Sequence, residues 1–80
     1  MSKVYHAPIG SWDILNDVEA ADDGNMYYAI LEHQEPDEYG ITVRRLTGYD
    51  LTREQAFAAM KSHNSAIGLW HDSMGFWYKP

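Results

Sequence analysis

Leu51-Thr52-Arg53-Glu54-Gln55-Ala56 carries the clearest local structural signal in the chain. Thr52 suits the N-cap of an α-helix, and Gln55 three residues later completes a capping box. The apolar spacing that follows predicts a helix that continues to about His63, with Asn64 suited to its C-terminal turn. A helix therefore begins directly after residue 51.

Two β-rich segments precede this helix. Residues 26–33 (MYYAILEH) and residues 39–49 are separated by the polar residues 34–38, which include a proline. Two strands joined by so short an acidic loop predict an antiparallel hairpin. Ala56, Phe57 and Met60 lie on one face of the helix, so we expect that face to pack on the sheet.

The C-terminal part reads as a second strand pair. We expect a strand over residues 66–71, a turn over residues 72–75 and a strand over residues 76–79. Residues 3–6 are a candidate short edge strand. The whole chain, residues 1–80, is predicted to be a single α+β domain: a small antiparallel sheet of about four strands packed against one or two helices.

Residues 12–21 admit two interpretations. Ser11 is a candidate N-cap, and Trp12, Leu15 and Val18 recur at three-residue spacing, which predicts an amphipathic helix. Trp12-Asp13-Ile14 can also open a strand with alternating faces. We favour the helix and keep the strand as the alternative.

Composition limits the classes of protein to which the chain can belong. It has 80 residues and no cysteine, so no disulfide stabilises it and no thiolate acts as nucleophile or metal ligand. Aromatic residues make up 14% of the chain, which suits a small core without covalent cross-links. No long apolar segment is present, so we expect a soluble protein that stays in the cytoplasm.

Charge is distributed unevenly along the chain. Residues 1–43 hold nine acids against Lys3, a net charge of −8, whereas residues 44–80 hold three acids against five bases, a net charge of +2. Negative potential over one part of a small protein repels nucleic acid and attracts basic protein surfaces. Such a face can imitate the charge of a nucleic-acid backbone, or it can simply keep the protein soluble.

No pattern of catalytic or metal-binding residues is recognisable. The four histidines do not have the spacing of a known metal site, and no glycine-rich phosphate loop or nucleophile elbow is present. We therefore expect no catalytic residues, no cofactor and no metal, and we expect a binding protein rather than an enzyme.

The candidate contact residues are carboxylates and large aromatic side chains. Exposed aromatic groups dominate many protein interfaces, and carboxylates can pair with Lys or Arg of a partner. The densest apolar cluster, residues 69–78, is expected to be partly core and partly contact surface. The predicted partner-binding residues are Asp17, Asp22, Asp23, Glu35, Asp37, Glu38, Tyr27, Tyr39, Trp70 and Trp77.

Small size, acidity, aromatic richness and the lack of cysteine together resemble the small phage-encoded inhibitors, including anti-CRISPR proteins. The resemblance is one of general character over the whole chain, without a diagnostic motif. It implies a stoichiometric inhibitor that docks on a bacterial nucleoprotein complex and blocks target DNA binding. The alternatives are a bacterial accessory or regulatory domain that forms a homodimer through its C-terminal aromatic hairpin and, less favoured, a small metal-assisted hydrolase.

Overall fold

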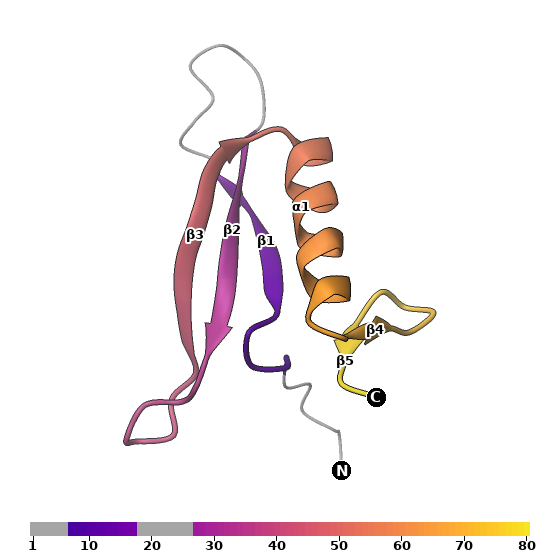
Figure 1. Cartoon of the computed structure of the whole chain (residues 1–80). Helices are drawn as coiled ribbons and strands as arrows, with labels where there is room; N and C mark the ends of the chain where they lie inside the picture. The colour runs from indigo at the N-terminus through magenta and orange to yellow at the C-terminus, as the bar shows by residue number, and fades with distance from the viewer. Residues whose placement is uncertain (1–6, 18–26) are drawn as a thin grey trace.

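The computed structural model describes residues 7–17 and 27–80, and its elements confirm an α+β fold. An antiparallel sheet has the strand order β1-β2-β3, and helix α1 lies along one of its faces (Figure 1). A separate hairpin, β4–β5, follows the helix. The bounds are β1 Trp12–Asp17, β2 Tyr27–Gln34, β3 Val43–Leu51, α1 Arg53–Ala66, β4 Trp70–His71 and β5 Trp77–Tyr78.

Residues 12–17 form a strand, so the favoured prediction of a helix there is wrong and its alternative is confirmed. All six residues of β1 pair with β2, from Trp12 opposite Glu32 to Asp17 opposite Tyr27. Ser11 is not an N-cap: it is buried, and its hydroxyl donates to the Pro8 carbonyl at 2.6 Å. Pairing with β2 therefore determines the conformation of these residues, although their three-residue apolar spacing favours a helix. The rest of the predicted helix, and the candidate strand at residues 3–6, lie outside the described residues.

Asn64 joins the helix to the edge of the sheet. Its side-chain Oδ1 accepts the Trp12 N–H at 2.8 Å, and its Nδ2 donates to the Trp12 carbonyl at 3.1 Å. Asn64 is fully buried, so this carboxamide replaces the neighbouring strand that β1 lacks on that side. His63 adds a second contact, because its ring stacks on Trp12 with centroids 3.9 Å apart and its Nε2 bonds the Gly10 carbonyl at 2.8 Å.

The helix begins as predicted and ends later. Thr52 and Gln55 form the expected capping box. The helix then continues past His63 to Ala66, so the strand predicted for residues 66–71 is reduced to Trp70–His71. The fourth strand is likewise shorter than predicted, at Trp77–Tyr78. The N–H groups of Ile67, Gly68 and Leu69 donate to carbonyls in the last turn of α1, so these three residues do not pair as a strand.

The β2–β3 hairpin is confirmed, but β3 starts at Val43 rather than at residue 39. Residues 37–41 form a closed loop instead, described below. β3 also shifts register against β2 on either side of Ile30, and Asp50 has a φ of 57°. Most of β3 is exposed, since α1 packs mainly over β1 and β2. Among the described residues, the buried apolar ones are Ala29, Ile30, Ala56, Met60, Leu69 and Trp77.

Glu32 is held ionised beneath the helix. The Trp12 indole N–H donates to its Oε2 at 2.9 Å, the Gln34 amide donates to its Oε1 at 2.6 Å, and Arg45 lies 3.6 Å from Oε1. The Trp12 hydrogen bond, followed by that of Gln34, lowers the pKa of Glu32, although partial burial acts in the opposite direction.

A lowered pKa in the folded state makes stability dependent on pH. The contribution of Glu32 is complete above the pKa that it has in the unfolded chain and is lost as the pH falls through its lower folded value. Glu32→Gln should therefore flatten the acid side of the stability curve, measured by urea unfolding at pH 7, 4 and 3. Glu38→Gln removes the same charge from an exposed loop and serves as the control. Equal acid slopes for wild type and Glu32→Gln would contradict this account.

Candidate protein-binding surface

The loop between β2 and β3 is a rigid hairpin end rather than a loose connection. The Asp37 N–H donates to the Ile41 carbonyl at 3.0 Å, and the Gly40 N–H donates to the Asp37 carbonyl at 2.9 Å. The Asp37 carboxylate then accepts the N–H groups of Tyr39 and Ile41 through one oxygen, both at 2.9 Å. Gly40 has a φ of 76°, which side chains other than glycine rarely tolerate. Four hydrogen bonds thus hold five residues in one conformation.

This loop exposes apolar and acidic groups together. Tyr39 is 80% exposed and Ile41 is 61% exposed, so neither side chain contributes much to the core of this chain. The exposed carboxylates of Glu35 and Glu38 lie in the same loop. Figure 1 shows the loop projecting beyond the end of the sheet, where a partner surface can reach it without meeting α1. The two chemical features of a contact site for a basic surface therefore coincide here.

The loop of the β4–β5 hairpin repeats the same construction. The Asp72 N–H donates to the Phe76 carbonyl at 2.9 Å, and the Gly75 N–H donates to the Asp72 carbonyl at 3.1 Å. The Asp72 carboxylate accepts the N–H groups of Met74 at 2.9 Å and Phe76 at 3.0 Å. Gly75 has a φ of 87°. The shared sequence pattern is Asp, any residue, a large apolar residue, Gly and a second large apolar residue.

Sequence reasoning missed this repeat, although the pattern is visible in the sequence. Asp37-Glu38-Tyr39-Gly40-Ile41 and Asp72-Ser73-Met74-Gly75-Phe76 match at the Asp, at the Gly and at both apolar positions. In both copies the apolar residue before the glycine is more exposed than the one after it: Tyr39 is 80% and Ile41 61% exposed, and Met74 is 79% and Phe76 45% exposed. The pattern was overlooked because glycines in these segments also suit ordinary turns.

Asp37→Ala should loosen the loop, whereas Glu38→Ala should leave it ordered. Both substitutions remove one negative charge, but only Asp37 holds the N–H groups of Tyr39 and Ile41. We expect lower backbone ¹⁵N order parameters at residues 39–41 in Asp37→Ala and a loss of about 1 kcal/mol of stability, the usual net value of hydrogen bonds of this kind. Unchanged order parameters in Asp37→Ala would show that the backbone bonds alone fix the loop.

Only three of the six predicted carboxylates lie together in the described part of the chain. Asp22 and Asp23 lie outside the described residues, and Asp17 is the last residue of β1. The other three are brought together in the exposed β2–β3 loop, and these are Glu35, Asp37 and Glu38.

The predicted aromatic residues do not share one surface. Tyr39 stands in the β2–β3 loop, whereas Tyr27 is half-buried at the opposite end of β2. Trp70 is 62% exposed on the β4–β5 hairpin. Trp77 is only 8% exposed and its ring lies edge-to-face with that of His71, so it belongs to the interior of this chain rather than to a contact surface.

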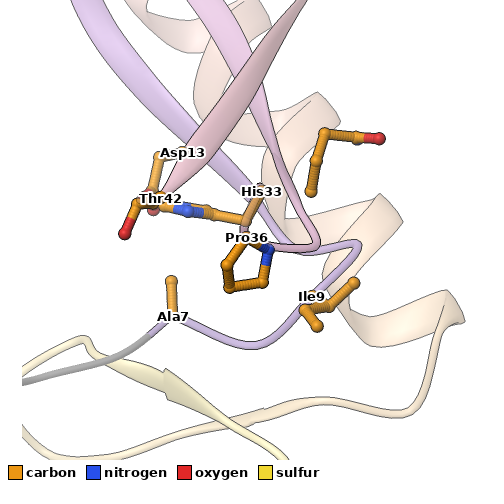
Figure 2. Close-up of a pocket in the computed structure, with 7 residues that line it drawn as sticks. Ala7, Ile9, Asp13, His33, Pro36 and Thr42 are labelled. Atoms are coloured by element: carbon orange, nitrogen blue, oxygen red, sulfur yellow. The ribbon is translucent and has the colours of Figure 1, made fainter. Parts of the chain in front are cut away.

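A pocket of about 400 Å³ lies at the base of the β2–β3 loop (Figure 2). In it the His33 ring points toward Asp13 and its Nε2 bonds the Asp13 carboxylate. The His33 side chain is 12% exposed, whereas that of Asp13 is 47% exposed. The lining residues are Ala7, Ile9, Asp13, His33, Gln34, Pro36 and Thr42.

Within residues 7–17 and 27–80, no group of three His, Asp or Glu side chains is placed to hold a metal ion. No helix in these two ranges has the length and apolar character that a membrane crossing needs. Comparison of the chain with protein-family models, with curated proteins and with solved structures finds no match.

Proposed function

We propose that this chain is a non-enzymatic inhibitor, of the anti-CRISPR kind, that docks on a basic nucleic-acid-binding surface of a bacterial effector complex and blocks target DNA. The observation that carries the proposal is the β2–β3 loop, where Tyr39 and Ile41 are exposed and held in place beside the carboxylates of Glu35 and Glu38. In this account the host cytoplasm is where the chain acts.

The chemistry of the loop fits such a partner. Carboxylates at the rim attract Lys and Arg and speed association, while an apolar tip that becomes buried slows dissociation. A loop that is already ordered loses little conformational entropy on binding, which favours affinity. The net charge of −6 adds a long-range attraction to a basic surface and a repulsion from DNA itself.

The proposal is tested by asking whether the chain displaces DNA. Proteins of a host bacterium that bind the immobilised chain at low salt and leave it at high salt are purified, and their DNA binding is measured with and without the chain. We expect one of them to lose DNA binding at a one-to-one ratio. A salt-sensitive partner that binds DNA equally well in the complex contradicts the proposal.

Self-association through the β4–β5 hairpin is the second candidate function. That hairpin exposes four large apolar side chains, and Trp70 lies opposite Tyr78 in its register. The exposed fractions are 62% for Trp70, 79% for Met74, 45% for Phe76 and 41% for Tyr78. Light scattering separates the two functions, because a dimer held by apolar contacts persists at high salt. The inhibitor that we favour does not need to form a dimer.

A further inference from the structure

We propose that the pocket beside the β2–β3 loop receives an arginine side chain of the partner, with the Asp13 carboxylate bonding its guanidinium. This inference rests on the proposed function, since it assigns a particular group of the basic partner to a particular site. The pocket does not include Tyr39 and Ile41, the apolar residues at the tip of the β2–β3 loop, so the arginine site and the proposed function can fail separately.

The pocket has walls of two kinds that match the two parts of an arginine side chain. Ala7, Ile9 and Pro36 form apolar walls that can cover an aliphatic stem. Asp13 and Thr42 supply oxygen acceptors in the same pocket. The volume of about 400 Å³ is within the range of small-molecule sites and accommodates one long side chain.

His33 fixes the direction of the Asp13 carboxylate. The His33 ring occupies one carboxylate oxygen and is itself nearly covered, while almost half of the Asp13 side chain remains accessible. A carboxylate that is oriented before binding loses little side-chain entropy when it pairs with a cation. A planar, weakly hydrated guanidinium can also lie against the flat surfaces of a histidine ring or a proline, which favours arginine over lysine here.

Arg44 should weaken the binding of the partner's arginine, and its substitution gives a second test of the site. It pairs with His33 in the β2–β3 register and therefore stands on the same sheet face as the His33–Asp13 pair. Its exposed positive charge repels an incoming guanidinium. Removing Asp13 and removing Arg44 should consequently change binding in opposite directions.

The test uses N-acetyl-arginine methylamide as the probe and its citrulline analogue, which has the same shape but no charge, as the comparison. We expect the arginine compound to move the ¹H–¹⁵N resonances of His33 and Thr42 with millimolar affinity, and the citrulline compound to leave them in place. Asp13→Asn should weaken the arginine compound about tenfold, as expected for one charge-assisted hydrogen bond. Arg44→Gln should strengthen it about two- to threefold, as for a surface charge pair.

Glu54→Gln is the matched control, because it removes a carboxylate from an exposed position on α1, outside the pocket lining, and should leave the affinity unchanged. Equal shifts from the citrulline compound would overturn the inference on the wild-type chain alone, without reliance on the folding of a variant. Unchanged affinity in a folded Asp13→Asn would overturn it as well. If the pocket fails these tests while Tyr39→Ala still weakens the partner complex, the proposed function stands and only the arginine site is lost.

Discussion

Replacing Asn64 with alanine should lower the free energy of unfolding by about 3 kcal/mol, because it leaves two buried backbone groups without partners. Asn64 is the only described side chain that bonds both the N–H and the carbonyl of Trp12. Asn64 is fully buried at this contact, and both hydrogen bonds are partly buried, so an alanine there offers the two groups no replacement partner. For a domain of this size such a loss is a large share of the total stability.

The measurement is urea unfolding followed by tryptophan fluorescence. Ser62→Ala, an exposed change on the same helix, is the control and should alter stability by less than about 0.5 kcal/mol. A loss below about 1 kcal/mol for Asn64→Ala would show that water satisfies the Trp12 backbone and that the two Asn64–Trp12 hydrogen bonds contribute little to stability.

Replacing Tyr39 with alanine should weaken the partner complex by about 2 kcal/mol, or about 30-fold in Kd, as for other aromatic hot spots. The ring is 80% exposed in the free chain, so removing it should hardly change stability. The loss of affinity should appear mainly as faster dissociation, because the acidic residues that attract the partner remain in place.

Tyr49→Ala is the matched control for this prediction. Tyr49 is 66% exposed, but it lies on β3 outside the β2–β3 loop. Kd is measured for both variants by surface plasmon resonance, with the host protein whose DNA binding the chain blocks as the partner. Similar affinities for Tyr39→Ala and wild type would remove the loop tip from the interface, and a larger effect of Tyr49→Ala would move the interface to the sheet.

The sequence predicted those elements whose signals are local. The capping box at Thr52 and the β2–β3 hairpin depend on residues that are neighbours in the chain. The β1 strand could not be predicted in the same way, because its state depends on pairing with β2 and on Asn64, which is 52 residues from Trp12. The end of α1 was misjudged for the related reason that Asn64 was assigned to a terminal turn rather than to a buried bond.

The candidate surface was predicted in part. Glu35, Asp37, Glu38 and Tyr39 were identified from charge and aromatic character, and the structure places them in one loop. That Asp37 orders this loop follows only from hydrogen bonds that composition does not reveal. The burial of Trp77 depends on how the β4–β5 hairpin packs. The pairing of Asp13 with His33 depends on two residues that are 20 positions apart and lie on adjacent strands.

Photo-crosslinking shows which part of the surface the partner contacts, with a benzoylphenylalanine placed at position 39 or, for comparison, at position 49 of the full chain expressed in a host bacterium. If the partner binds the β2–β3 loop, position 39 crosslinks to Lys- and Arg-rich peptides of a nucleic-acid-binding protein, and position 49 gives few crosslinks. Crosslinks from position 49 alone, or from position 39 only to a second copy of this chain, would contradict binding of the partner at this loop.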